Sequence, residues 1–208
     1  MPTFSYERRI GGLVAGVDEA GRGPLAGPVV AAAVVFKGFT LPRALSGRID
    51  DSKKIAAEDR ESTFTTLRRL AQRGDILIGV GAASVEEIDR INILQATFAA
   101  MRRAVARLPS TPDAALVDGN LAPPNLGCRA ETLVDGDARS LSIAAASIVA
   151  KVLRDRAMVR LSARYAGFGW QTNVGYSTPE HIEALGRLGP TKHHRLSFSP
   201  CAQTSLPL

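Results

Sequence analysis

The stretch VDEAGRGPLAGPVV, residues 17–30, places two adjacent carboxylates in front of a glycine-rich segment. The apolar run LVAGV (13–17) leads into it and the β-branched run PVVAAAVVF (28–36) follows, so the stretch should join two neighbouring strands. A dinucleotide fingerprint needs G-x-G-x-x-G at the start of a helix, whereas the third glycine here is one position late and a strand follows. A Walker loop needs Gly-Lys-Ser/Thr, which the stretch lacks. The stretch therefore predicts a hairpin, and its two acids need a separate explanation.

Helices and strands alternate along the chain after this hairpin. Ser84 and Glu87 form a capping box for one helix, and Thr178 with Pro179 begins a later one. The alternation predicts an α/β domain with a central mixed sheet flanked by helices. The expected strands are 13–17, 28–36, 75–84, 114–118 and 128–135, and the expected helices are one that ends at Gly74, then 84–109, 140–166 and 178–189.

Three parts of the chain are expected. Residues 1–167 should form the α/β domain, and residues 168–200 should form a helical C-terminal extension. Residues 201–208 should form a disordered tail, as chain ends commonly do.

Composition limits the class of protein. The 208 residues are 45% hydrophobic, which suffices for a buried core, and 26 Lys and Arg against 20 Asp and Glu give a net charge of +6. A basic surplus favours a polyanionic partner, nucleic acid before membrane. Cys128 and Cys201 are far apart and form no C-x-x-C pair, so two reduced thiols are expected. No apolar run is long enough for a signal peptide or a bilayer span, so a cytoplasmic protein is expected. A monomer is also expected.

Carboxylates stand at predicted strand ends three times. Asp18 and Glu19 follow the first strand, Asp118 ends ALVD, and Asp137 follows another strand. An ionised carboxylate at the end of an apolar strand is costly unless it is solvated, paired or bound to a cation. Any one of them could be a turn residue or a helix cap, and that interpretation is preferred for Asp135. The set of four favours hard oxygen ligands for Mg²⁺ or Mn²⁺ at one edge of a sheet.

The adjacency of Asp18 and Glu19 raises a geometric difficulty. Successive side chains of an extended strand point to opposite faces, so both cannot aim at one metal from a regular strand. Either the chain turns at Glu19, or Glu19 contributes partly through its backbone carbonyl. The glycines that follow would allow such a turn.

Six motifs occur in order from about residue 11 to about residue 198: DEAGRGPLAGPVVAAAV, DSKK, INILQATFAAM, LVDGN, GDARSLSIAAASIVAKVLRD and NVGYST. Together they closely resemble the bacterial type 2 ribonucleases H (ribonuclease HII). The resemblance implies a ribonuclease H-like fold with a helical C-terminal extension. It also implies an endoribonuclease that cleaves the RNA strand of RNA–DNA hybrids, including single ribonucleotides embedded in duplex DNA. The implied chemistry uses two metal ions and leaves 5′-phosphate and 3′-hydroxyl ends.

Site residues follow from the same resemblance. It assigns the family's four acids, which act as catalytic residues and as ligands for Mg²⁺ or Mn²⁺, to Asp18, Glu19, Asp118 and Asp137. Backbone groups of Gly21-Arg22-Gly23 would approach the ribose 2′-hydroxyl, the group that separates RNA from DNA. Tyr176 would pack on the neighbouring sugar, although an ordinary half-buried aromatic is the alternative. Further candidates for substrate binding, each with a surface or packing role as the alternative, are Lys53, Lys54, Asn92, Ser147 and Lys151.

Three histidines remain. His193 and His194 form a small basic cluster with Arg195, for which phosphate contact or surface packing is expected. His181 is expected to be structural.

The C-terminal sequence QTSLPL offers another possible contact. Its spacing of Gln203, Leu206 and Leu208 resembles the short peptide by which bacterial replication proteins bind the sliding clamp. A disordered end without a partner is the alternative.

Two other functions share the predicted fold. One is a hybrid-binding module without enzymatic activity, which loss of any of the four acids would favour. The other is a nuclease or resolvase that acts on DNA alone, against which the Gly21-Arg22-Gly23 segment and Tyr176 argue.

Overall fold

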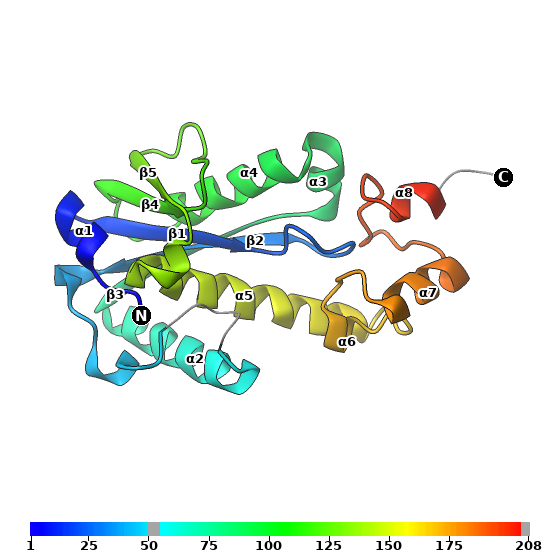
Figure 1. The fold of residues 1–208 in the computed structure, drawn as a ribbon, viewed down its shortest axis with the longest axis horizontal. Coiled ribbons are helices and arrows are strands. Elements are labelled where there is room, and N and C mark those ends of the chain that lie inside the picture. The colour runs from blue at the N-terminus through cyan, green and yellow to red at the C-terminus, as the bar shows by residue number, and fades with distance from the viewer. Residues whose placement is uncertain (50–54, 205–208) are drawn as a thin grey trace.

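The computed structural model describes residues 1–49 and 55–204. A five-stranded sheet in the order β3-β2-β1-β4-β5 forms its centre (Figure 1). The hairpin strands β1 and β2 are antiparallel, as are β2 and β3, whereas β4 is parallel to β1 and β5 is parallel to β4. The predicted mixed sheet is therefore confirmed, with strands β1 (Val14–Ala20), β2 (Val29–Phe36), β3 (Ile76–Ala83), β4 (Ala114–Asp118) and β5 (Arg129–Leu133).

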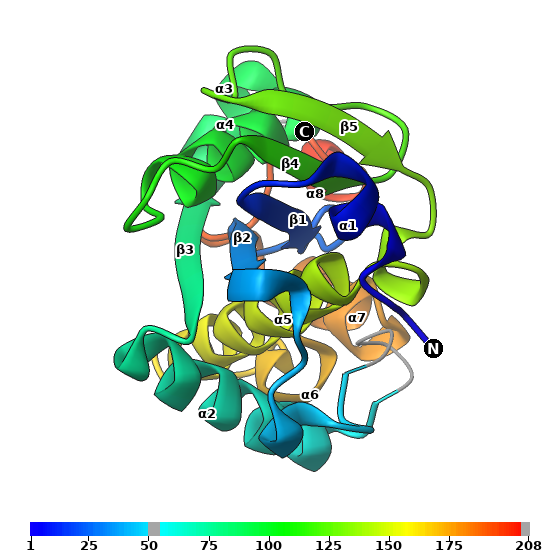
Figure 2. The same ribbon diagram turned by 90° about the vertical axis from the view of Figure 1, so that its left-hand side faces the viewer.

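Helices cover both faces of this sheet. Helices α3 and α4 lie on one face, and α5 lies on the other with α2 beside it (Figures 1 and 2). Helices α6, α7 and α8 gather beyond the far end of α5 (Figure 1). The helices are α1 (Ser5–Ile10), α2 (Ala57–Arg73), α3 (Val85–Ile91), α4 (Ile93–Ala106), α5 (Leu141–Ser162), α6 (Trp170–Asn173), α7 (Pro179–Leu188) and α8 (Cys201–Thr204), with 3-10 turns at η1 (Lys37–Phe39), η2 (Arg43–Leu45) and η3 (Gly136–Ala138).

Two apolar cores result from the period-2 alternation of the central strands. Ala31 and Ala33 of β2 belong to the core beneath α4, whereas Ala32 and Val34 belong to the core shared with α5 and α2. Both faces of β2 are buried, which explains its uninterrupted apolar sequence.

Close packing of α5 on β1 depends on a missing side chain. A Cβ atom at Gly16 would lie 2.1 Å from the backbone carbonyl carbon of Ser142, in the first turn of α5. Glycine at this position lets the helix backbone rest directly on the strand. The contact places the middle of α5 over the end of β1.

One predicted helix is wrong in its extent, and one of the two alternatives considered for Glu19 is excluded. The single helix expected over 84–109 is divided at Asn92, whose φ of 66° interrupts the helix and whose side chain accepts the Gln95 N–H as the cap of α4. With φ 66° and ψ 164° the backbone of Asn92 is not helical, so α3 ends there, and the Asn92 side chain caps α4 as asparagine commonly does. The turn considered at Glu19 does not occur there, because β1 stays extended to Ala20, which pairs with Val30. The capping box of Ser84 and Glu87 is confirmed at the start of α3.

The end of the chain also differs from expectation. The tail predicted to begin at residue 201 starts with the short helix α8, and the Cys201 side chain is fully buried against Leu25 and Leu185. Apolar contacts therefore hold the chain in place at Cys201, where a disordered tail was expected to begin. Leu206 and Leu208 lie outside the described residues. No helix in the described ranges is long and apolar enough to cross a membrane.

A buried pair of histidines joins the segments of the C-terminal region. His181 Nδ1 donates to the Tyr176 carbonyl oxygen at 2.8 Å, and its Nε2 accepts the Trp170 indole N–H at 3.1 Å. His194 Nδ1 accepts the Thr191 backbone N–H at 2.9 Å, and its Nε2 lies 3.1 Å from Nε2 of His181. All four ring nitrogens have partners while both rings are neutral. The surface or phosphate-binding position expected for His194 is wrong, because this side chain is only 1% exposed.

This buried pair predicts a loss of stability in acid. Burial, followed by the charges of His181 and His193, lowers the pKa of His194 from 6.5 to about 4. The unfolded chain therefore takes up a proton below pH 6.5 that the folded chain refuses until about pH 4, so stability that is complete above pH 6.5 falls in this window. We expect urea unfolding to show a loss of up to about 3 kcal/mol from this group between pH 7 and pH 4. The variant His194→Gln should lose less over the same range, and an equal loss in both proteins would contradict the assignment.

Candidate active site

The predicted acids meet where β1 and β4 end side by side. These strands are parallel and Val17 pairs with Val117, so Asp18 and Asp118 follow at the same edge of the sheet. A cavity of about 530 Å³ opens at this edge. Its lining residues come from β1 and the loop after it, α2, β4, α5 and the segment before α7: Asp18, Glu19, Ala20, Gly21, Arg22, Gly23, Arg60, Asp118, Ser147, Lys151, Arg154 and Tyr176.

Asp18 lies on the α5 side of the sheet and is 5% exposed. Burial, then the negative charges of Glu19 and Asp118, raises its pKa well above the usual value. Hydrogen bonds act in the opposite direction: the Ser147 side chain bonds this carboxylate, and the Glu19 backbone N–H donates to Oδ1 at 2.6 Å. Ser147, expected to contact substrate, thus lines the cavity as a partner of Asp18.

Glu19 lies on the opposite face of β1, as the strand alternation requires. Its side chain borders a second, smaller hollow of about 50 Å³ against α4, in which Asp118 and Met101 also take part. Arg22 Nη1 forms an ion pair with Glu19 Oε1 at 3.4 Å. Because Glu19 stands near the end of the sheet, it borders both hollows and reaches the same cavity as Asp18.

Asp118 is held by the turn that follows β5. The backbone N–H of Gly136 donates to Asp118 Oδ1 at 2.7 Å. Asp137 is the next residue in this turn and is 7% exposed, but it is not among the described residues that line the cavity. Asp135 has a φ of 53°, the conformation of a turn residue, in agreement with the interpretation preferred from the sequence. The structure thus brings three of the four acids to one cavity and puts the fourth beside the anchor of Asp118.

Gly21 forms the part of the wall where the loop leaves β1. Its φ is 98°, and a Cβ atom there would lie 2.0 Å from Nε of Arg154. Both the conformation and the space therefore require glycine at this position.

Tyr176 lies beside Gly23 in the lining of the cavity. A Cβ atom at Gly23 would lie 3.9 Å from the Tyr176 ring, and the tyrosine is 45% exposed. The Leu25 N–H donates to the Gly175 carbonyl at 2.8 Å, which ties the loop to the segment that carries Tyr176. Gly21, Gly23 and Tyr176 thus line the same cavity.

Cationic side chains surround the acids. Lys151 forms an ion pair with Asp155 at 2.9 Å, and Arg60 and Arg154 also line the cavity. The sequence interpretation missed both arginines. Ser147, Lys151 and Arg154 follow one another at the i, i+4, i+7 spacing of one helix face, which is the signal that could have identified Arg154.

Of the three remaining candidates for substrate binding, only Asn92 lies within the described residues. Lys53 and Lys54 fall outside the described residues. Asn92 caps α4 and is not among the described residues that line the cavity.

Carboxylates make this site chemically suitable for a divalent cation. Asp18, Glu19 and Asp118 offer hard oxygen donors, and the repulsion that raises the pKa of Asp18 is what a bound cation would relieve. The donor types fit Mg²⁺ or Mn²⁺. Within the described ranges, however, no three His, Cys, Asp or Glu side chains are already arranged as a metal site.

Comparison with known proteins identifies the family. The family model for ribonuclease HII matches residues 15–201. The curated ribonuclease HII of Granulibacter bethesdensis is 61% identical, over 95% of this chain and 89% of that protein. That of Rhodospirillum rubrum is 58% identical, over 100% of this chain and 95% of that protein.

Solved structures agree with the fold. The ribonuclease HII of Archaeoglobus fulgidus, solved in complex with PCNA, has a TM-score of 0.72 at 27% identity and covers 90% of this chain and 95% of its own. Ribonuclease H2 of Pyrococcus horikoshii has a TM-score of 0.71 at 28% identity, over 92% of this chain and 96% of its own. The expected ribonuclease H-like fold is thereby confirmed. The chain belongs to the ribonuclease HII family, whose members are metal-dependent endoribonucleases that act on RNA–DNA hybrids.

Proposed function

We propose that the protein also cleaves DNA duplexes at single embedded ribonucleotides, by two-metal-ion catalysis with Mg²⁺ or Mn²⁺, leaving 5′-phosphate and 3′-hydroxyl ends. One observation carries the proposal: three acids, the Gly21–Gly23 loop and Tyr176 line a single cavity. A phosphate next to one ribose could then meet the acids while its sugar meets the loop.

Asp18 and Asp118 are the best candidates for direct metal ligands. They stand on neighbouring strand ends, and each is oriented by a backbone N–H, from Glu19 and Gly136 respectively. Glu19 and Asp137 would complete the set, Asp137 from the turn that holds Asp118. Two bound cations would supply an activated water and stabilise the charge on the leaving 3′ oxygen.

The loop and Tyr176 would select the sugar. A 2′-hydroxyl is a small group that both donates and accepts hydrogen bonds, so backbone groups without obstructing side chains suit it. Tyr176 would offer its exposed ring to the adjacent sugar. Lys151 and Arg154 would attract the phosphates, because they line the same wall.

A sliding clamp is the proposed protein partner. The ribonuclease HII of Archaeoglobus fulgidus assembles with PCNA, and the C-terminal sequence of this chain carries Gln203, Leu206 and Leu208 at the spacing of a clamp-binding peptide.

Loss of Asp118 should abolish incision. Wild type should cut a DNA duplex containing one ribonucleotide in Mg²⁺ or Mn²⁺, and Asp118→Asn should be at least about a hundredfold slower, because one oxygen donor and one negative charge are lost. Gel analysis of end-labelled duplex measures the rate, and ligation of the products tests for the 5′-phosphate. Asp135→Asn is the matched control, since asparagine tolerates the left-handed turn at that position. No incision by wild type, or equal rates for wild type and Asp118→Asn, would disprove the proposal.

Truncation of Tyr176 should lower kcat/KM on the same duplex without abolishing incision. Tyr176→Ala removes the apolar contact of the ring with the sugar, and burial of a large apolar side chain is worth about 1.5–3 kcal/mol, so kcat/KM on the single-ribonucleotide duplex should fall about tenfold or more. Tyr176→Phe retains the ring and should stay within about threefold of wild type. Steady-state kinetics on both variants provides the measurement, and an unchanged Tyr176→Ala would remove this residue from the proposed site.

Deletion of residues 203–208 should separate clamp binding from hydrolysis. The truncated protein keeps Cys201, which is buried in the fold, and all the residues that line the cavity. Surface plasmon resonance on immobilised bacterial clamp should detect binding by the full chain alone, while both proteins cut the single-ribonucleotide duplex equally. Retained clamp binding by the truncated chain would contradict the assignment.

A further inference from the structure

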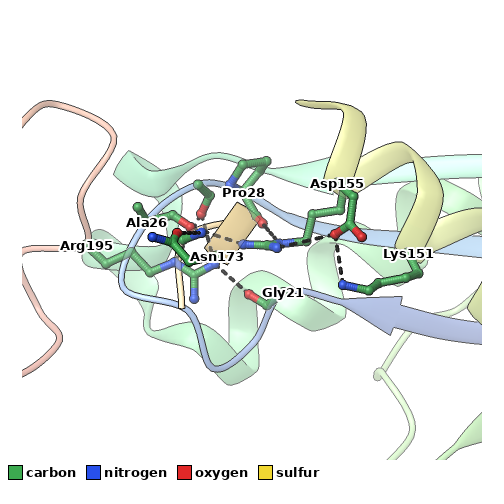
Figure 3. A network of polar contacts seen from close by, with 10 residues as sticks. Gly21, Ala26, Pro28, Lys151, Asp155, Asn173 and Arg195 are labelled. Carbon is green, nitrogen blue, oxygen red and sulfur yellow. Dashed lines mark hydrogen bonds and ion pairs between the residues drawn. The ribbon is translucent and has the colours of Figure 1, made fainter. Parts of the chain in front are cut away.

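Two buried arginines from distant parts of the chain hold the loop between β1 and β2. Figure 3 shows one of them, Arg195, in the network of contacts that includes Gly21. We call this pair, Arg154 of α5 and Arg195 beyond α7, the arginine clamp. Arg154 donates through Nε to the Pro28 carbonyl at 3.2 Å and through Nη2 to the Ala26 carbonyl at 3.1 Å. It therefore secures the part of the loop that returns to β2.

Arg195 secures the part that leaves β1. Its Nη2 donates to the Gly21 carbonyl at 2.5 Å and its Nη1 donates to the Arg22 carbonyl at 2.8 Å. Nε and Nη2 also donate to the Gly27 carbonyl, at 3.1 and 2.9 Å. The side chain is fully buried, and all three of its nitrogens are used on backbone oxygens. Burial, followed by the charge of Arg154, lowers the pKa of Arg195 to about 9, so the guanidinium keeps all of its donors at neutral pH.

These bonds determine where the neighbouring N–H groups point. In a planar trans peptide the carbonyl of one residue and the N–H of the next point in opposite directions. Fixing the carbonyls of Gly21 and Arg22 on Arg195 therefore directs the N–H groups of Arg22 and Gly23 away from it. Arg22 and Gly23 both line the cavity that holds the acids.

The segment that carries Arg195 also helps to position Tyr176. The Arg195 backbone N–H donates to the Leu25 carbonyl at 2.8 Å. His194, the preceding residue, lies 3.1 Å from His181, which donates to the Tyr176 carbonyl. One short stretch of chain thus sets both the loop and the tyrosine beside it.

We propose that Arg195 is a positioning residue for sugar selection: it aims the N–H groups of Arg22 and Gly23 at the ribose, so that preference for a ribonucleotide depends on it. The inference rests on the proposed function, in which this loop meets the 2′-hydroxyl. Lysine is not equivalent at this position, because a single ammonium group cannot reproduce the planar fork that spans three carbonyls.

Binding measurements test this without cleavage. In an Asp118→Asn background, fluorescence anisotropy gives Kd for two duplexes that differ only by one 2′-hydroxyl, and their ratio is the sugar preference. Arg195→Lys should reduce this ratio at least about fivefold. Arg195→Gln should reduce the ratio by a similar factor. Because it places no unpaired charge in the interior, it replaces the lysine variant if that protein does not fold.

Asp89→Asn is the matched control. Asp89 accepts the backbone N–H groups of Leu196 and Ser197 at 3.0 Å, so it anchors the same segment through residues other than Arg195, whose bonds to the loop would remain. Thermal melting should show lower stability for both Asp89→Asn and the Arg195 variants, but Asp89→Asn should keep the sugar preference within about twofold.

Each outcome has a definite meaning. A full preference in Arg195→Lys or Arg195→Gln would overturn the inference, and so would an equal loss in Asp89→Asn, because general loosening would then suffice. If the Asp118→Asn background shows no preference and wild type does not incise the ribonucleotide duplex, the proposed function itself fails and the inference fails with it. If the Asp118→Asn background shows a sugar preference and only the Arg195 variants lose it, the result supports Arg195 as the positioning residue.

Discussion

Repulsion among carboxylates at the ends of β1 and β4 is the constraint on which the rest of this structure depends. Asp18 is buried beside Glu19 and Asp118, and both burial and like charge disfavour its ionised form. The Asp18 carboxylate therefore has to be held in position by the surrounding structure. The contact between Gly16 and the first turn of α5 contributes to this, because it places the helix where Ser147 can bond Asp18. The Gly136 turn does the same for Asp118.

The sheet and the C-terminal region contribute different parts of the site. Carboxylates come from strands whose positions are fixed by two apolar cores. The loop after β1 and the tyrosine beside it take their positions from Arg195 and the histidine pair of the C-terminal region. The extension is therefore part of the site's architecture, since it determines where the backbone of the loop points.

Much of this could be predicted from local sequence, and the exceptions have physical causes. The alternation of apolar runs with helical patterns identified the mixed sheet, and the acids at strand ends identified the site edge. The break at Asn92 was missed because the apolar stripe continues across it. The burial of His194 and Arg195 was missed because the flanking charges of TKHHR suggest an exposed segment. Arg195 is buried through contacts with residues more than 150 positions away, such as Gly21, whereas His194 is buried against His181 and Thr191 of its own region.

The pairing pattern of the loop has an evolutionary consequence. Its two ends continue into β1 and β2, whose ladder is fully paired and whose cores leave little room for change. Outside the sheet, the loop is attached to Arg154 of α5 and to the segment around Arg195, and this segment is joined to the helical extension. Under the proposed role of Arg195, sequence drift in that extension would alter which sugars the enzyme accepts while the acids at the strand ends stay in place. Directed evolution of nucleotide selectivity would then start there.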